Sequence, residues 1–431
     1  MIPTPSPTSP AGGLSRRHAW ALTLVATFTM AVSYVDRQTL AVIAPTVQLK
    51  LGFDDQRYGW LVSAFSIAYL VGAPVAGRLI DRVNARRGLL VAVFVWSGVA
   101  AIHAFVPGYG VLFALRIALG LAEAPSFPGA AQTIHRALPP RDRARAFGVL
   151  FSGSSFGAML APPLAIWLTA RYGWRFAFVG TALVGLSWVP LWLYVTRTPE
   201  ARAVLDRPSE EAAIPGATPD AEATPGPFAL VLHPAVLRAV LVVIATSPLL
   251  SFYFNWSAKY LVHDHHLLQK DLAQYLWFPP LFFDAGAILF GHFASRARAR
   301  GEDGVPRRLV ALATLLMIGS FAAPFAPTPM AMLAVASVSL AGGGGLFALA
   351  TTDMMARVSP RQVSAAGGIT AAAQSLAYIV ANLLIGPSVQ ISGSYTPAFL
   401  GLTAWILPGC VVWLLWRLAP SPRLPAVATD R

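Results

Sequence analysis

Charged side chains are scarce in this chain of 431 residues. Only 12% of the residues are charged, against roughly a quarter in soluble globular proteins. Hydrophobic residues make up 56% of the chain, and the mean hydropathy is +0.59. This composition excludes a soluble globular protein and indicates that most of the chain lies in a membrane.

Cysteine and the common catalytic motifs are also missing. The single cysteine, Cys410, excludes an intramolecular disulfide, and its apolar surroundings predict a small core residue. No Gly-rich phosphate loop ending in Lys-Ser/Thr occurs, which argues against an ATP-driven pump. No nucleophile–base motif occurs either, so we expect no catalytic residues, no enzyme activity and no cofactor.

One cluster could be mistaken for a metal site. His263, Asp264, His265 and His266 are consecutive, however, and consecutive residues do not have the spacing of a closed site. We expect a solvated loop and no bound metal.

Long apolar runs recur from end to end, each long enough to cross about 30 Å of hydrocarbon as a helix. There are twelve, at approximately 19–44, 58–80, 88–106, 109–136, 145–170, 174–196, 237–262, 272–297, 306–325, 328–352, 362–391 and 395–418. The sequence therefore predicts an all-α membrane protein with twelve transmembrane helices in two six-helix bundles. The predicted parts are a disordered cytoplasmic N-terminus (1–18), a first bundle (19–196), a flexible cytoplasmic linker (197–233), a second bundle (234–418) and a cytoplasmic tail (419–431).

The formal net charge of +13 has two possible explanations, nucleic-acid binding or membrane topology. Most of the 32 Lys and Arg residues are dispersed among the short connections, mostly on one side of the spans. The positive-inside rule explains this asymmetry if both termini are cytoplasmic. We therefore expect lipid rather than nucleic acid around the protein.

A few charges interrupt the apolar runs. Arg116 and Glu123 lie in the predicted helix 112–135, on one face because seven residues make about two turns. Asp36 and Arg37 are adjacent within the first span, so each needs a partner of its own. Charges at this depth usually face a cavity, a partner or a permeating substrate, although a purely structural ion pair is the alternative.

The connection after the second span carries a spaced pattern of glycine and charge, G-x-x-x-D-R-x-G-x-R-R. Its members are Gly77, Asp81, Arg82, Arg86 and Arg87, with Asn84 in place of the inner glycine. A small residue there allows close helix packing, and the basic residues mark the cytoplasmic side. A weaker copy follows in the second half, where Ser295 stands in place of the acid. This pattern resembles the loop signature of the major facilitator superfamily, and its repetition implies duplicated bundles.

A closer resemblance is carried by the runs RIALGLAEAPSFPGAAQTIH, FSGSSFGAMLAPP, SYVDR, GWLVSAFSIAYLVGAP and SFYFNWSAKYL. They resemble the anion:cation symporter family, which includes bacterial transporters of hexuronates, galactonate and glucarate, and animal vesicular glutamate and sialic acid carriers. The resemblance implies that Arg37 meets the substrate carboxylate, that Asp36 and Glu123 are protonation sites, and that Arg116 is the switching partner of Glu123. Elementary chemistry agrees, since arginine is a permanently charged, forked donor for carboxylates.

Several polar residues could complete the cavity. Tyr34 and Tyr69 are candidate hydroxyl donors, and Ser154 falls where the family often has a polar contact, although packing is the alternative for all three. In the second half, Asn255 lies among aromatic residues. Gln374 and Asn382 roughly share a helix face, where they could bond a sugar hydroxyl or simply another helix.

These observations predict a secondary transporter that imports a small organic anion, most simply a sugar acid, with protons, by alternating access between two bundles. The alternatives are a carrier or exporter of another carboxylate, such as an aromatic or dicarboxylic acid, and a non-transporting membrane receptor. We expect a monomer in a bacterial inner membrane.

Overall fold

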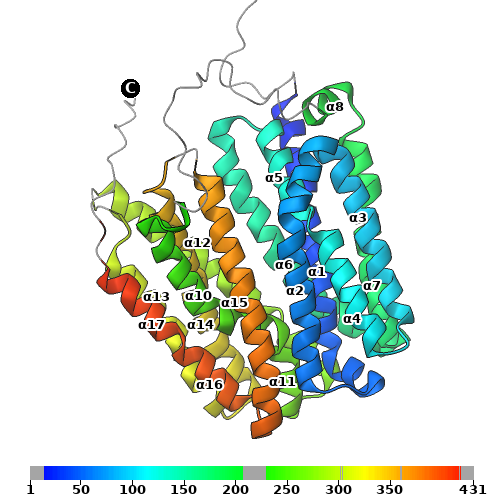
Figure 1. Cartoon of the computed structure of the whole chain (residues 1–431), viewed down its shortest axis with the longest axis vertical. Coiled ribbons are helices and arrows are strands. Elements are labelled where there is room, and N and C mark those ends of the chain that lie inside the picture. The colour runs from blue at the N-terminus through cyan, green and yellow to red at the C-terminus, as the bar shows by residue number, and fades with distance from the viewer. Residues whose placement is uncertain are drawn as a thin grey trace, which may run out of the picture. The chain divides into compact units, whose positions relative to one another are not determined.

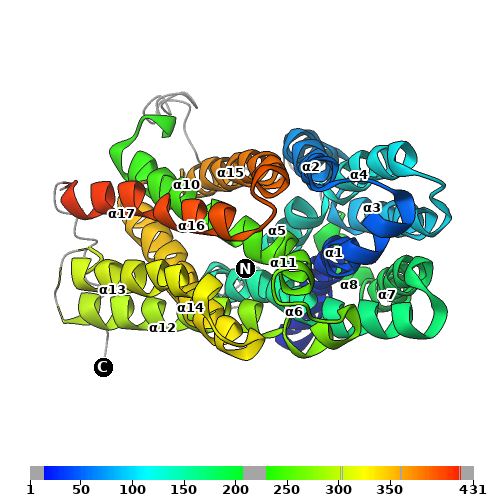
Figure 2. The same ribbon diagram turned by 90° about the horizontal axis from the view of Figure 1, so that it is seen from below.

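The computed structural model describes residues 14–206, 230–300, 302, 304–359, 362–416 and 418, and nearly all of them are helical (Figures 1 and 2). Among these residues, twelve helical stretches are long and apolar enough to cross a membrane. The predicted all-α membrane protein with twelve spans is confirmed. Residues 1–13 of the predicted N-terminal tail, most of the predicted linker and all of the predicted C-terminal tail lie outside the described residues, and residues 16–18 belong to the first helix.

The helices of the first half follow one another with short connections. They are α1 (Arg16–Leu51), α2 (Asp55–Val83), α3 (Ala85–Ile102), the 3-10 turn η2 (His103–Phe105), α4 (Tyr109–Glu123), α5 (Ser126–Ala137), α6 (Pro140–Tyr172), α7 (Trp174–Val195) and α8 (Pro199–Leu205).

The second half has the same all-helical character. It consists of α10 (Pro234–Asn255), α11 (Ser257–His263), η4 (Gln269–Gln274), α12 (Phe278–Ala299), α13 (Arg307–Ile318), η5 (Gly319–Phe325), α14 (Pro329–Met355), α15 (Val363–Ser392), α16 (Thr396–Ala404) and α17 (Ile406–Leu415).

The chain divides into two compact units that do not coincide with the halves of the sequence. The first unit comprises residues 1–221, 251–281 and 378–397, and the second comprises 222–250, 282–377 and 398–431. The first unit therefore contains the N-terminal helices together with the end of α10, all of α11 and the last part of α15. The predicted split into two six-helix bundles stays a prediction.

Helix α1 is the central element of the first unit and packs against α5, α6 and α7 (Figure 2). A Cβ atom at Gly157 of α6 would lie 2.1 Å from the carbonyl oxygen of Ala31, so only glycine permits this approach. Trp188 of α7 is fully buried and donates its indole N–H to the carbonyl of Val25 at 2.7 Å. These contacts fix the rotation of α1, which carries Asp36 and Arg37.

The predicted single helix over 112–135 is wrong in one respect, because it is broken. Helix α4 ends at Glu123, two residues form a turn, and α5 begins at Ser126. Pro125 in the turn has no backbone N–H to continue the helical hydrogen bonds, and the sequence also carries Pro128. Glu123 thus lies at a helix end rather than at mid-helix.

Two other boundaries differ from the prediction. The predicted span 237–262 is divided at Trp256 into α10 and α11. The predicted linker does not begin as a flexible segment, since α8 buries Ala201, Val204 and Leu205 and packs against α3 and α5. Thr198 caps its first turn by accepting a hydrogen bond from the N–H of Ala201 at 3.3 Å.

In the second unit, the glycine run 342–345 lies inside the continuous helix α14. A Cβ atom at Gly344 would lie 1.9 Å from the carbonyl oxygen of Phe283. The run therefore serves close helix packing. Asp353 of the same helix is buried and pairs with Arg238 and Arg357, each at 3.1 Å, which is a structural ion-pair network.

Candidate functional site

The first unit holds a buried ion pair between α1 and α4. Nε of Arg37 donates to Oε2 of Glu123 at 2.7 Å, and the Ser33 hydroxyl donates to the same oxygen at 2.6 Å. The Glu123 side chain is fully buried, whereas that of Arg37 is 17% exposed. Oε1 of Glu123 has no hydrogen-bond partner among the described residues. The carboxylate therefore uses one of its two oxygens and keeps the other free.

Three aromatic rings surround the Arg37 guanidinium. Its Cζ lies 5.0 Å from the ring centroid of Tyr34, 4.9 Å from Phe65 and 4.5 Å from Tyr69. Cation–π contacts hold the planar group in one orientation without using its N–H donors. Nη2 is buried and has no partner among the described residues. A fixed, forked donor with an unused N–H group is suited to an incoming carboxylate.

Arg116 and Glu123 form no ion pair or hydrogen bond in this conformation, so the role of Arg116 as the switching partner of Glu123, which the resemblance implies, stays a prediction. Its side chain is 4% exposed, and its Nε has no hydrogen-bond partner among the described residues. Its Cζ instead lies 4.7 Å from the ring centroid of Phe65. The neighbouring helices α1 and α2 thus supply the cation that pairs with Glu123 and the ring that contacts Arg116.

Asp36 is buried, with 3% of its surface exposed, and neither carboxylate oxygen accepts a hydrogen bond from the described residues. The expectation that each of the two adjacent charges has its own partner holds for Arg37. The Asp36 carboxyl group has the Thr181 hydroxyl beside it and no ion-pair partner among the described residues, so a charged partner for it stays a prediction.

Ser154 of α6 is half-buried and lies beside the Tyr34 side chain, so it belongs to the same cluster. The cluster also contains two residues that the sequence analysis missed, Ser33 and Phe65. Each lies four residues before a predicted one, Ser33 before Arg37 and Phe65 before Tyr69. Helical spacing of four was the available signal for both.

The candidates from the second half are not in this cluster. Asn382 is fully buried, and its side-chain oxygen accepts hydrogen bonds from Ser251 at 3.0 Å and from Trp256 at 2.9 Å. Asn255 donates to the Ser251 hydroxyl at 3.2 Å. Of the two roles that the sequence left open for Asn382, hydrogen bonding to another helix is the one present in this structure. Gln374 is half-buried on α15 and belongs to the second unit.

A second buried ion pair lies where α2 begins, which we call the Asp55 end. Lys259 of α11 is 5% exposed and pairs with Oδ1 of Asp55. Gln48 donates to the same oxygen at 3.0 Å, and the Tyr395 hydroxyl donates to Oδ2 at 2.9 Å. Burial lowers the pKa of Lys259 to about 8, against the opposing attraction of Asp55. The sequence analysis did not predict this pair.

The glycine-and-charge motif spans the other end of α2 and the start of α3. Asn84 adopts a φ of +77° and its side chain accepts a hydrogen bond from the N–H of Arg87 at 3.1 Å, which explains how it replaces a glycine. Arg86 forms a forked pair with Asp206, with Nη2 to Oδ2 at 2.6 Å. Arg82 and Arg87 are exposed.

A Cβ atom at Gly77 would meet nothing within 4 Å, so no helix among the described residues packs closely against this glycine in this conformation, and close packing there stays a prediction. The side chain of Asp81 lies outside the described residues.

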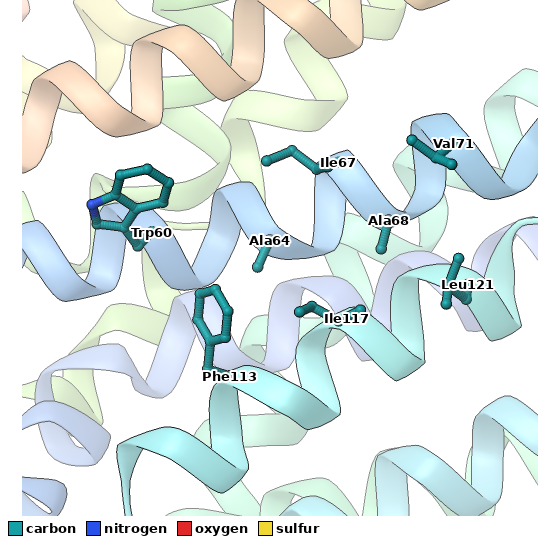
Figure 3. A pocket seen from close by; sticks show the side chains of 8 residues that line it. All are labelled: Trp60, Ala64, Ile67, Ala68, Val71, Phe113, Ile117 and Leu121. Atoms are coloured by element: carbon teal, nitrogen blue, oxygen red, sulfur yellow. The ribbon is translucent and has the colours of Figure 1, made fainter.

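A groove between α2 and α4 is lined entirely by apolar side chains (Figure 3). Ala64 and Ala68 of α2 face Ile117 and Leu121 of α4, and the small alanine side chains leave the space between the helices. No hydrogen-bonding side chain other than the indole of Trp60 lines it, so this groove cannot hold an organic anion. The charged cluster around Arg37 is the candidate site.

Comparison with known proteins agrees with this arrangement. The family model described as Major Facilitator Superfamily matches residues 26–302. A hexuronate transporter of Escherichia coli (strain K12) is 26% identical, covering 93% of this chain and 95% of its own length. A galacturonate transporter of Dickeya chrysanthemi is 29% identical, covering 70% of this chain and 89% of its own length.

A solved structure has the same fold. It is a bacterial homologue of the human lysosomal transporter Spinster, in an inward-facing and unoccupied conformation, with a TM-score of 0.75 at 16% identity. It covers 93% of this chain and 97% of its own. The family and the relatives are membrane transporters rather than enzymes, and the resemblance to sugar acid transporters seen in the sequence is confirmed. The chain is an integral, multi-pass membrane protein that belongs to the major facilitator superfamily.

Proposed function

We propose that the protein is a proton-coupled symporter that imports a small sugar acid, such as a hexuronate, aldonate or aldarate, across a bacterial inner membrane by alternating access. The relatives named above transport sugar acids, and the buried pair of Arg37 and Glu123 is the observation that carries the proposal. Both termini are cytoplasmic in this proposal, which puts the Asp55 end outside. The protein works as a monomer.

The coupling follows from competition for one guanidinium. While Glu123 is ionised, it holds Nε of Arg37 and opposes the approach of a second anion. Protonation removes that charge, so the guanidinium becomes free to bind the substrate carboxylate through its fork. Proton binding and substrate binding then favour each other, which is the thermodynamic requirement for symport.

Other residues of the cluster act on substrate orientation and on proton number. The Tyr34, Tyr69 and Ser154 hydroxyls are donors beside the guanidinium and can bond the sugar hydroxyls. Asp36 is a second protonation site, since its carboxyl group is buried and has no ion-pair partner among the described residues. Asn255 and Gln374 contribute to the substrate site from the second half in the course of the transport cycle.

The test uses purified protein in proteoliposomes. Uptake of labelled galacturonate, galactonate and glucarate is measured with an inward proton gradient, with a sodium gradient and with neither, beside succinate and benzoate. We expect accumulation of at least one sugar acid under the proton gradient alone. Accumulation only of succinate or benzoate, or only with sodium, would contradict the proposal.

Glu123→Gln tests the coupling role. The amide mimics the protonated acid permanently, so the variant should still exchange substrate across the membrane but lose gradient-driven accumulation. Glu200→Gln on α8, which removes an exposed acid, is the matched control. If Glu123→Gln accumulates substrate as the wild type does, the coupling proton travels elsewhere, and Asp36→Asn becomes the next variant.

A further inference from the structure

The Phe65 ring contacts both buried arginines of the cluster. Its centroid lies 4.9 Å from Cζ of Arg37 and 4.7 Å from Cζ of Arg116. The two positive charges therefore lie within about 10 Å of each other, where they repel in a medium of low dielectric constant. Phe65 is itself 6% exposed, and its ring stacks on that of Tyr69 with an interplanar angle of 17°. The ring is thus held in place rather than free to turn.

The helix crossing that places this ring is unusually close. Gly120 lies between Arg116 and Glu123 on α4, and a Cβ atom there would approach the carbonyl oxygen of Phe65 to 2.5 Å. Close approach of α2 at this position brings the Phe65 side chain against the segment that joins the two charges. A larger residue at position 120 would push the ring away from Arg116.

Two complementary groups remain unpaired beside this ring. Nε of Arg116 and Oε1 of Glu123 are both buried and have no hydrogen-bond partner among the described residues. The two residues share one face of α4, two turns apart. An unpaired buried donor and acceptor each cost about as much as a lost hydrogen bond. A desolvated cation–π contact offsets part of this cost for the guanidinium.

We propose that Phe65 is a positioning residue for proton coupling: its ring holds Arg116 away from hydrogen-bond distance of Glu123, so that Arg37 is the only arginine that bonds this carboxylate. This inference rests on the proposed function and deepens it. A carboxylate held by two cations binds a proton less readily than one held by a single cation. By keeping the second cation apart, the ring keeps Glu123 able to take up the coupling proton.

The charged and titratable groups around Glu123 and its arginines come from four elements. Arg37, Asp36 and Tyr34 lie on α1, and Arg116 lies on α4 itself. Tyr69 of α2 acts on Arg37, Tyr58 of α2 acts on Arg116, and Arg116 in turn acts on His103 of η2. Among these, Arg116 is the cation whose position the Phe65 ring sets.

The experiment compares the pH dependence of gradient-driven uptake in Phe65→Leu, Phe65→Tyr and the double variant Phe65→Leu/Arg116→Gln. Leucine keeps apolar volume but removes the ring, so Arg116 can reach Glu123 and the pH profile should shift by about one unit toward acid. Uptake should fall about tenfold at pH 7.5 and recover near pH 6. Phe65→Tyr retains the ring and should restore the wild-type profile.

The double variant separates a positioning role from simple packing. If the ring acts through Arg116, adding Phe65→Leu to Arg116→Gln should leave the pH profile where Arg116→Gln alone puts it. Phe290→Leu on α12 is the packing control. Phe290 is 4% exposed and has no cation–π contact among the described residues, so this variant should keep the wild-type profile.

Three results would overturn the inference: equal loss of uptake at every pH, additive effects in the double variant, or no restoration by tyrosine. An experimental structure of Phe65→Leu gives a readout that needs no transport, since Arg116 should then bond Glu123. A structure of Phe65→Leu in which both arginines keep their present positions would also contradict the inference. Failure of the proposed function is distinguishable, because in that case the wild type itself accumulates no sugar acid under a proton gradient.

Discussion

The two buried ion pairs of the first unit differ in how fully their atoms are used. At the Asp55 end, both oxygens of Asp55 are engaged, by Lys259 and Gln48 on one side and by Tyr395 on the other. In the central cluster, Glu123 keeps one oxygen unpaired and Arg37 keeps Nη2 unpaired. A satisfied pair resists exchange because every alternative loses a bond, whereas an unsatisfied pair has groups ready for a new partner. The first arrangement is suited to holding helices together, and the second to binding and release.

The surroundings of the two cations reinforce this difference. Lys259 lies 4.6 Å from the Tyr58 ring and 4.9 Å from the Trp256 ring, in a pocket where only 6% of its side chain is exposed. Arg37 is also surrounded by rings, but its side chain is 17% exposed. Lysine carries a compact charge, whereas arginine offers several N–H groups in one plane. The Arg37 guanidinium can therefore keep its hydrogen bond to Glu123 or to a substrate through one N–H group while another N–H group changes partner.

The largest expected effect is at the central pair. Arg37→Lys keeps the charge but removes the fork, so substrate cannot be bound by two parallel hydrogen bonds. We expect uptake at subsaturating substrate to fall about 100-fold, the equivalent of roughly 3 kcal/mol. Arg57→Lys at an exposed position is the control and should transport normally. Near wild-type uptake by Arg37→Lys would contradict the substrate-binding role.

A smaller effect is expected from breaking the satisfied pair. We call the Asp55 end closed while Asp55 bonds Lys259 and Tyr395, and open when these residues separate. Asp55→Asn leaves the more buried member, Lys259, without its counter-charge, and we expect the closed form to lose about 2 kcal/mol relative to the open form. Lys259→Met should cost less, because Asp55 is 20% exposed and keeps Gln48 and Tyr395 as donors. The measurement is the distance distribution between spin labels at the exposed positions Leu49 and Ile391, with Cys410 replaced by alanine. If Lys259→Met destabilised the closed form more than Asp55→Asn does, burial would not be the property that decides which loss costs more.

Sequence analysis located the central cluster but not its pairing. The charges at 36, 37, 116 and 123 were conspicuous because they interrupt apolar runs, and the spacing of Arg116 and Glu123 predicted that they share a face. The choice of Arg37 as the partner of Glu123 depends on how α1 and α4 approach each other, which one helix cannot specify. The break between α4 and α5, by contrast, had a visible signal in Pro125 and Pro128.

The pair at the Asp55 end could not be predicted from the sequence for a different reason. Asp55 and Lys259 are 204 positions apart, and each also lies near a helix end, where an exposed charge is ordinary. Only the folded chain brings α2 and α11 together and buries both groups. Likewise, the sequence left two roles open for Asn382, and the contacts with Ser251 and Trp256 decide between them for this conformation.

The pH response of the Asp55 end should be about tenfold. In the closed form the pKa of Lys259 is about 8, whereas a solvated lysine titrates near 10.5. At pH values between these two pKa values, the closed form therefore binds fewer protons than the open form does. Raising the pH must then favour closure. From pH 7 to pH 9 the closed population should gain about tenfold over the open one, measured with the same two labels. Lys259→Met should abolish the response, and opening on alkalinisation would contradict it.

The smallest expected effect is at a third pair, Arg86 with Asp206, which is more exposed than the other two. The side chains are 19% and 28% exposed, so solvent screens the attraction and the pair should contribute less than about 1 kcal/mol. The forked geometry still joins α3 to the end of α8, whose buried face and the hydrogen bond from Arg136 to the Leu205 carbonyl hold the helix independently. Asp206→Asn should therefore speed amide hydrogen exchange in α8 severalfold but change the initial rate of uptake by less than about twofold. Glu200→Gln, which removes an exposed acid from the same helix, should change neither quantity. A tenfold loss of uptake in Asp206→Asn would mean that this more exposed pair, like the buried ones, controls a step of transport. Exposure would then not be the property that distinguishes the three ion pairs.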